Sequence, residues 1–184
     1  MLELVYETHS TTVDNGEGRA TGWLPGELSA VGREQARALG ARRRNDGLDA
    51  VFSSDLERAI ETARIAFDGT AIPRFLDWRL RECNYGELNG RPVPEIDAVR
   101  ARKVDEPYPG GESYRQVAER VASFLADLAA RFDGGRVLVV SHAAPRWAIE
   151  HLLEGRPLEE LVVAPFEWQE GWLYRLDPGQ TRQG

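Results

Sequence analysis

Short apolar runs alternate with amphipathic stretches along most of the chain, which is the pattern of strands alternating with helices. The runs at 2–7, 49–53, 72–76 and 136–141 predict strands, and helical spacing marks 30–44, 55–67, 112–132 and 144–154. The β-branched run at 136–141 is typical of a strand covered on both faces. This alternation predicts an α/β fold, a three-layer helix/sheet/helix sandwich with a mainly parallel sheet.

The remaining segments are less regular. Residues 8–28 form a loop rich in glycine, proline and threonine, and residues 77–111 are irregular around a short helix near 94–103. Residues 162–168 and 171–176 resemble a terminal pair of strands, and Gly32 is a weak spot in the helix at 30–44. We expect a single domain over 1–176 and a frayed tail over 177–184.

Two of the three histidines follow predicted strands directly. His9 comes after the run at 2–7, and His142 comes after the run at 136–141. In an open α/β sheet the chemistry gathers beyond the carboxyl ends of the strands, so these histidines are expected to share one site. The alternative is two unrelated loop histidines. His151 lies within a predicted helix and is expected to be structural or solvent-facing.

Composition narrows the classes of partner. The chain has 184 residues, a net charge of −7 and a pI near 5.1, which argue against a general binder of nucleic acid or anionic membranes. A local arginine cluster still permits a small anionic substrate. Cys83 is the only cysteine, so an intramolecular disulfide is excluded. Neither a signal-peptide pattern nor a membrane-length apolar run occurs, and we expect a cytoplasmic protein.

Several side chains near the strand ends suit phosphate chemistry. A neutral histidine such as His9 can attack phosphorus while the hydroxyls and N–H groups of its loop bind the oxygens. Arg58 is expected on the first turn of a helix that follows a strand, where a guanidinium can bind phosphate; a solvated surface arginine is the alternative. His142 precedes a helix N-terminus, which also favours an anion.

A carboxyl group in the loop at 77–90 is a candidate general acid. Glu82 lies among aromatic residues and is the first choice, and Glu87 is its rival. A salt bridge from Glu82 to Arg79 or Arg81 is the structural alternative. Trp78, Tyr85 and Tyr108 either pack on an apolar leaving group or cap the core, and the segment 77–111 is expected to act as the lid that selects the substrate.

The order of these motifs resembles the histidine phosphatase superfamily, also called phosphoglycerate mutase-like. The resemblance covers nearly the whole chain. It rests on the strand-end His9, the helix Ser54–Ala63 with its Ser-x-x-x-Arg-Ala-x-x-Thr-Ala spacing, Leu80-Arg81-Glu82, Gly111-Glu112-Ser113, and Ser141-His142. The resemblance implies the phosphoglycerate mutase-like fold and a phosphomonoester hydrolase that acts through a phosphohistidine.

The resemblance also implies roles for individual residues. His9 would be the nucleophile, Glu82 the proton donor, and Arg58 with His142 would hold the phosphoryl oxygens. The substrate-binding set would be Thr8, Ser10, Asn15, Arg19 and Ala143. The substrate would be a small phosphorylated metabolite, and no metal or organic cofactor is implied.

This chain departs from the family pattern next to both histidines. The family has arginine where Thr8 stands and glycine at Ser10 and Ala143. The missing arginine removes a charge-assisted contact worth about 1.5–3 kcal/mol. Arg19, Arg81 or Arg146 could substitute for it. A catalytically weak phosphate-binding or regulatory module is therefore the alternative function, followed by a phosphoglycerate mutase-type phosphotransferase.

Overall fold

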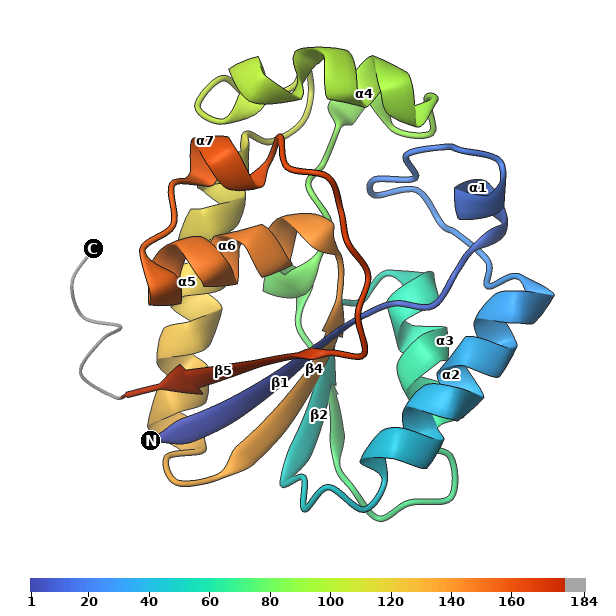
Figure 1. Cartoon of the computed structure of the whole chain (residues 1–184), viewed down its shortest axis with the longest axis vertical. Helices are drawn as coiled ribbons and strands as arrows, with labels where there is room; N and C mark the ends of the chain where they lie inside the picture. Colours follow the sequence, from blue (N-terminus) through green and yellow to red (C-terminus); the bar gives the residue numbers. More distant parts are fainter. Residues whose placement is uncertain (178–184) are drawn as a thin grey trace.

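The computed structural model describes residues 1–177, which form a five-stranded sheet with helices on both faces (Figure 1). The strands stand in the order β3-β2-β4-β1-β5. Only β5 runs antiparallel to its neighbour, β1. Their bounds are β1 Leu2–Thr8, β2 Ala50–Ser53, β3 Arg74–Leu76, β4 Arg136–Ser141 and β5 Trp172–Leu176. The predicted mainly parallel sandwich is therefore confirmed.

Alternation along the strands divides the core between two helical layers. Val5 of β1 packs in a cluster with side chains of α2 (Ala30–Arg43) and α3 (Glu57–Ala66). Leu4 and Tyr6 point the other way, into the larger cluster that includes α5 (Tyr114–Arg131) and α6 (Ala143–Glu154). Successive strand side chains face opposite sides of the sheet, which explains this split.

Shorter elements surround the carboxyl end of the sheet. They are α1 (Val13–Gly16), α4 (Val93–Arg100), α7 (Leu158–Leu161) and 3-10 turns at Trp78–Leu80, Gly86–Leu88 and Ala101–Lys103. Figure 1 shows α4 above the strand ends. Ser29 caps α2 by accepting a hydrogen bond from the Gly32 N–H.

Two local expectations were wrong. Residues 162–168 form no strand: Pro165 lacks an N–H, and β5 pairs with the free edge of β1 instead of with this segment. Gly32 is no weak spot, because a Cβ at this position would lie 2.0 Å from the Thr11 carbonyl oxygen, so only glycine lets α2 approach the first loop this closely. Of the expected tail, residues 178–184 lie outside the described part of the chain.

The pairing register sets the position of the two predicted histidines. Thr8, the last residue of β1, pairs with Ser141, the last residue of β4. The chain therefore leaves two neighbouring parallel strands at the same level, and His9 and His142 come next. No helix in residues 1–177 is both long enough and apolar enough to span a bilayer.

Candidate active site

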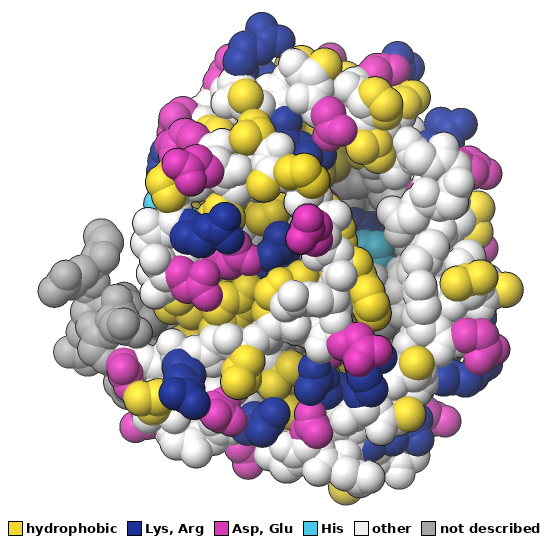
Figure 2. All heavy atoms as spheres, in the orientation of Figure 1, with side chains coloured by type: hydrophobic (Ala, Val, Ile, Leu, Met, Phe, Trp, Pro, Cys, Tyr) yellow, Lys and Arg dark blue, Asp and Glu magenta, His cyan; other side chains and the backbone are white. Residues whose placement is uncertain are grey.

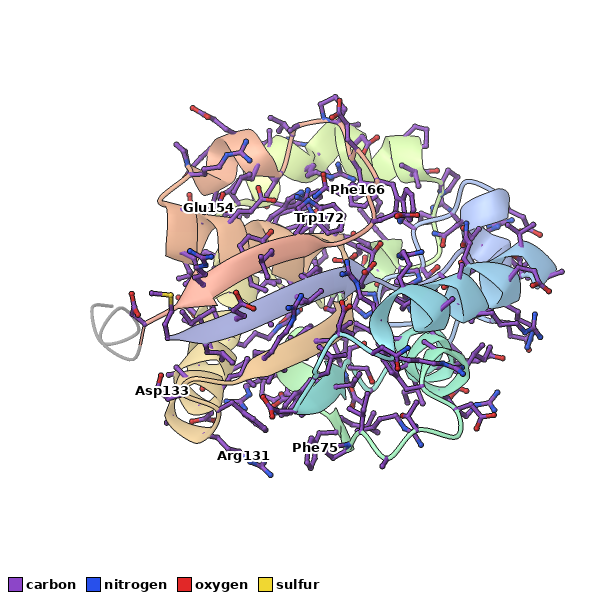
Figure 3. All side chains as sticks on the ribbon, turned by 60° about the horizontal axis from the view of Figure 1, so that its bottom comes forward. Phe75, Arg131, Asp133, Glu154, Phe166 and Trp172 are labelled. Atoms are coloured by element: carbon purple, nitrogen blue, oxygen red, sulfur yellow. The ribbon has the colours of Figure 1, made fainter. Side chains whose placement is uncertain are left out.

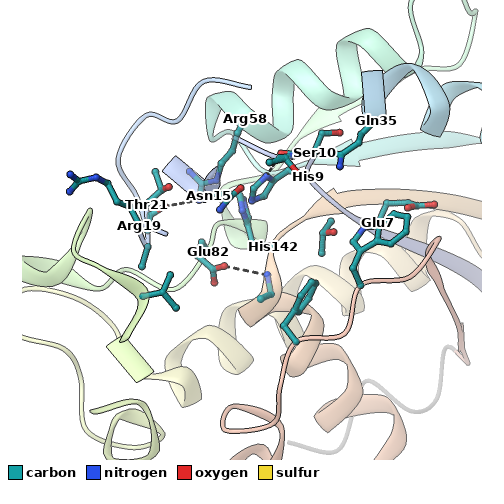
Figure 4. A pocket seen from close by; sticks show the side chains of 18 of the residues that line it. Glu7, His9, Ser10, Asn15, Arg19, Thr21, Gln35, Arg58, Glu82 and His142 are labelled. Carbon is teal, nitrogen blue, oxygen red and sulfur yellow. Dashed lines mark hydrogen bonds between the residues drawn. The ribbon is translucent and has the colours of Figure 1, made fainter. Parts of the chain in front are cut away.

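His9 and His142 lie together at the floor of a cavity of about 710 Å³. Their ring centroids are 5.0 Å apart and the rings are tilted by 55°. Arg58 and Glu82 line the same cavity (Figure 4), and Figure 2 shows the hollow with a histidine side chain inside it. The structure thus brings the four predicted catalytic residues into one place, although four separate segments supply them.

The ring of His9 presents one nitrogen to the cavity as a lone pair. Its backbone N–H donates to the Ser141 carbonyl at 2.8 Å, and Nδ1 lies 2.8 Å from the Ser10 carbonyl. A carbonyl only accepts, so Nδ1 carries the proton and Nε2 does not. Burial, and next the charge of Arg58, lowers the pKa of His9 to about 3. The neutral form, which a nucleophile requires, is therefore the resting state at neutral pH.

Two hydroxyl groups hold His142, one at its backbone and one at its ring. The Tyr6 hydroxyl donates to the His142 carbonyl and accepts from its N–H, at 2.6 and 3.1 Å. The Ser54 Oγ lies 2.6 Å from Nε2 and accepts a hydrogen bond from the Leu56 N–H. Within residues 1–177, His142 Nε2 is the acceptor available to the Ser54 hydroxyl, so we assign the proton of His142 to Nδ1. Burial holds the pKa of His142 well below its usual value.

Arg58 is a buried arginine and not a surface charge. It lies on the first turn of α3 and is 2% exposed. Its Nη2 donates to the Gly22 carbonyl at 2.7 Å and its Nη1 to the Leu24 carbonyl at 3.2 Å. The first loop therefore holds the guanidinium in place while leaving further N–H groups for an anion in the cavity.

Glu82 is bound to the start of α6, not to an arginine. Its Oε1 accepts hydrogen bonds from the N–H groups of Cys83 and Ala144, and its Oε2 accepts from Ala143. Its own carbonyl accepts from Trp23 and Arg120, which anchors the loop. The expected alternative, a salt bridge from Glu82 to Arg79 or Arg81, is absent from the described ion pairs. Arg79 binds Asp77 and Asp127, and Arg81 binds Asp55. The rival Glu87 is exposed and lies outside the cavity lining.

The five predicted substrate-binding residues, Thr8, Ser10, Asn15, Arg19 and Ala143, all line the cavity. Ser10 is buried, and its N–H donates to the Thr62 hydroxyl at 3.0 Å. Arg19 is exposed and binds the Glu17 carboxylate at 3.1 Å. Of these side chains, Arg19 is the cation, and it is only loosely held at the rim.

Two of the arginines that could have replaced the family arginine point elsewhere. Arg81 forms a bidentate pair with Asp55 and its guanidinium lies 4.5 Å from the centre of the Trp23 ring. Arg146 pairs with Glu150, four residues on along α6, and stacks on Trp172. Neither lines the cavity. Arg146 lies one turn after His142, but its side chain runs along the helix toward Glu150 and not into the site.

The expected aromatic lid is largely replaced by another segment. Of the three candidates, only Tyr85 lines the cavity; Trp78 is 53% exposed outside it and Tyr108 is buried in the core. Phe166 and Trp168, which come after Pro165, line the cavity instead. No pattern in the sequence indicates this, apart from two aromatic residues in the segment 162–168, which was predicted to be a strand.

Two further arginines, Arg42 and Arg100, line the cavity without having been predicted. They stand on α2 and at the end of α4, and a helical position alone does not show which arginine faces a cavity. Within residues 1–177, no group of three or more histidine, cysteine, aspartate or glutamate side chains is placed to hold a metal ion.

Comparisons with known proteins agree with this geometry. The family model described as histidine phosphatase superfamily (branch 1) matches residues 8–182. A probable phosphoglycerate mutase GpmB from Enterobacter sp. (strain 638) is 32% identical over 94% of this chain and 88% of its own length.

Solved structures are similar over most of the chain. Bacillus stearothermophilus YhfR is 28% identical, with a TM-score of 0.85 over 97% of this chain and 93% of its own. A mycobacterial glucosyl-3-phosphoglycerate phosphatase in complex with VO3 is 29% identical, with a TM-score of 0.79 over 89% of this chain and 87% of its own. On the family match and the fold together, this chain belongs to the histidine phosphatase superfamily, branch 1.

Proposed function

We propose that this protein hydrolyses a small phosphomonoester through a phosphohistidine on His9. The observation that carries the proposal is the cavity itself, in which an unprotonated ring nitrogen, a second histidine, a fixed arginine and a carboxyl group converge. Positioning and charge stabilisation are what phosphoryl transfer chiefly needs from a protein. Phosphatases among the similar solved structures, one of them complexed with VO3, support the same chemistry.

In the first step, His9 Nε2 attacks phosphorus and forms the N–P bond while the bond from phosphorus to the ester oxygen breaks. Arg58 and the Nδ1–H of His142 donate to the phosphoryl oxygens, whose charge must be stabilised in the transition state. Glu82 in its protonated form gives its proton to the leaving oxygen, which departs as an alcohol.

In the second step, water attacks the phosphohistidine. Glu82, now a carboxylate, takes a proton from that water, and the N–P bond breaks to release inorganic phosphate. His9 returns to its neutral form, which its lowered pKa favours. The N–H groups of Ala143 and Ala144 hold the Glu82 carboxyl group at the cavity wall.

Replacement of the nucleophile tests the proposal directly. His9→Ala is expected to abolish both phosphate release from a generic monoester and covalent labelling by that substrate, without loss of the fold. His151→Ala is the matched control, because His151 lies on α6 outside the cavity lining and bonds to the Arg156 carbonyl. A folded His9→Ala protein that keeps most of its phosphatase rate would show that the proposed mechanism is wrong.

Thr8 favours a second candidate, a catalytically weak phosphate-binding or regulatory module. It stands directly before His9, where the family has arginine, and it is half-buried at the cavity wall. Retention of His9, His142 and Arg58 in contact with one cavity speaks against that candidate. A mutase-type phosphotransferase, suggested by the name of the GpmB relative, would move phosphate between positions of one substrate without releasing it.

A further inference from the structure

The cavity extends well beyond the space that a phosphate needs. Figure 4 places Arg19 and Thr21 on one side of the histidine pair, and Glu7 and Gln35 on the other. We call the second side the α2 groove. It is lined by Gln35, Ala38, Leu39 and Arg42 of α2, and by Phe166, Trp168 and Glu170 of the segment before β5. A cavity of about 710 Å³ is large enough to bury a drug-sized ligand, so the groove has room for a leaving group.

Trp168 gives the α2 groove an aromatic wall that is open to a ligand. The side chain is 60% exposed, and within residues 1–177 its ring has no aromatic or cationic partner and its indole N–H has no acceptor. Phe166 stands beside it, 44% exposed, with its ring centroid 6.3 Å from that of Trp172 (Figure 3). Large aromatic surfaces at a cavity wall gain free energy by stacking on a flat ligand.

Across the groove, the exposed Ala38 supplies an apolar surface on α2, with the buried Leu39 beside it. A planar apolar group could therefore lie between this surface and Trp168. Gln35 is a polar side chain on this wall, and its Oε1 already accepts a hydrogen bond from the Thr11 N–H.

Arg42, which also lines the groove, has unused hydrogen-bond donors. Its closest described partners are the carboxylates of Glu7 and Glu170, at 3.5 and 3.7 Å, and its buried Nε has no acceptor in residues 1–177. The neighbouring Arg43, in contrast, donates to Glu7, Asp46 and the Glu170 carbonyl. A guanidinium offers five N–H groups in a fixed plane, so Arg42 can still bind an acceptor on a ligand.

The charge around Arg42 defines the kind of acceptor. Glu7 and Glu170 already neutralise this arginine, so a second phosphate or a carboxylate would meet two like charges. A carbonyl, amide or similar neutral acceptor avoids that repulsion and can still accept from a guanidinium N–H of Arg42.

We propose that the α2 groove binds the leaving group, and that the substrate is the phosphate monoester of a planar, largely apolar alcohol whose far end carries a neutral hydrogen-bond acceptor. Trp168 stacks on the planar part and Arg42 donates to the acceptor. That the bound ester is a substrate rests on the proposed phosphatase function, whereas its binding in the groove does not depend on that function.

Binding of phosphonates, which cannot be hydrolysed, tests the groove separately from turnover. We would titrate the protein calorimetrically with 1-naphthylmethylphosphonate and with propylphosphonate. The wild type is expected to bind the naphthyl compound more tightly by about tenfold or more, and Trp168→Ala to remove most of that preference. Trp78→Ala is the control, because Trp78 is 53% exposed but lies outside the cavity. Equal affinities for the two phosphonates, or an unchanged preference in Trp168→Ala, would overturn the proposal.

A second titration tests Arg42 with naphthylmethylphosphonates that carry a carboxamide or a carboxylate on the distal ring. The carboxamide is expected to improve binding to the wild type by about fivefold to tenfold, and Arg42→Met to remove that gain without weakening the unsubstituted compound. Tighter binding of the carboxylate than of the carboxamide would refute the neutral acceptor. A protein that shows these preferences but hydrolyses no monoester would refute the proposed function and leave the groove assignment standing.

Discussion

Ser54→Ala removes the hydroxyl group that sets the protonation of His142. Ser54 is fully buried and its Oγ lies 2.6 Å from Nε2, so the variant leaves a buried ring nitrogen without a donor. The ring then either keeps an unpaired lone pair or moves its proton from Nδ1 to Nε2. In the second case Nδ1 presents a lone pair to the phosphoryl oxygens and repels them.

The size of the effect follows from the lost hydrogen bond. A hydrogen bond to a charged group contributes about 1.5–3 kcal/mol. Loss of the Nδ1–H contact in the transition state is therefore expected to lower kcat by about 10- to 150-fold. KM should change less, because Arg58 and the loop N–H groups still bind the ground-state phosphate. The free energy of unfolding should also fall by about 1–3 kcal/mol for the unsatisfied nitrogen.

Two measurements separate this role from general destabilisation. Nitrogen-15 NMR of histidine-labelled protein reports which ring nitrogen of His142 carries the proton, and steady-state kinetics report kcat and KM. Ser54→Thr should restore the Nδ1–H form, since it keeps a hydroxyl. Ser141→Ala removes a neighbouring buried hydroxyl that donates to the Leu80 carbonyl, so it should cost stability without changing the ring proton. A Ser54→Ala protein with an unchanged ring signal and kcat within about threefold of wild type would refute the reasoning.

Two other outcomes are expected. His142 has a lowered pKa in the folded state, so below its unfolded pKa of 6.5 the unfolded chain binds a proton that the folded chain does not. His142 should therefore lower the free energy of unfolding by about 1.4 kcal/mol per pH unit below that value, and His9, whose pKa is also lowered, should add a similar amount. Urea unfolding at pH 7 and pH 5 in phosphate-free buffer should show a shallower pH dependence of the free energy of unfolding for His142→Asn than for the wild type. Thr8→Arg should change kcat/KM by less than tenfold if nearby cations such as Arg19 already supply the missing charge; a rescue of about tenfold or more, equal to about 1.4 kcal/mol, would instead support the weak-module candidate.

The positions of the candidate catalytic residues were predictable because local sequence determines them. His9 and His142 follow buried strands directly, and parallel neighbours end at the same edge of a sheet. Arg58 follows a strand by one short turn, so its position depends only on the boundary of β2 and α3. For these residues, the hydrophobic pattern was enough to place the side chain near the cavity.

The outer part of the cavity was not predictable in this way. Trp168 reaches the cavity because β5 pairs antiparallel with β1, and that pairing joins residues far apart in the chain. Arg42 and Arg146 both look like surface arginines on helices, and only the packed structure shows that the first faces the cavity and the second turns to Glu150. Charge partners chosen by tertiary packing leave no periodic signal in the sequence.

The segment between α7 and β5 has a consequence for how specificity could change. It crosses the cavity between two anchored elements and contributes Phe166 and Trp168, yet none of the four residues assigned to phosphoryl transfer belongs to it. On the proposed function, recognition of the alcohol and phosphoryl transfer therefore lie on separate pieces of chain. Exchange of residues 163–170 for a segment of equal length should produce modular variants that accept different alcohols and keep the same transfer chemistry, so this stretch is the natural place to diversify in a designed library.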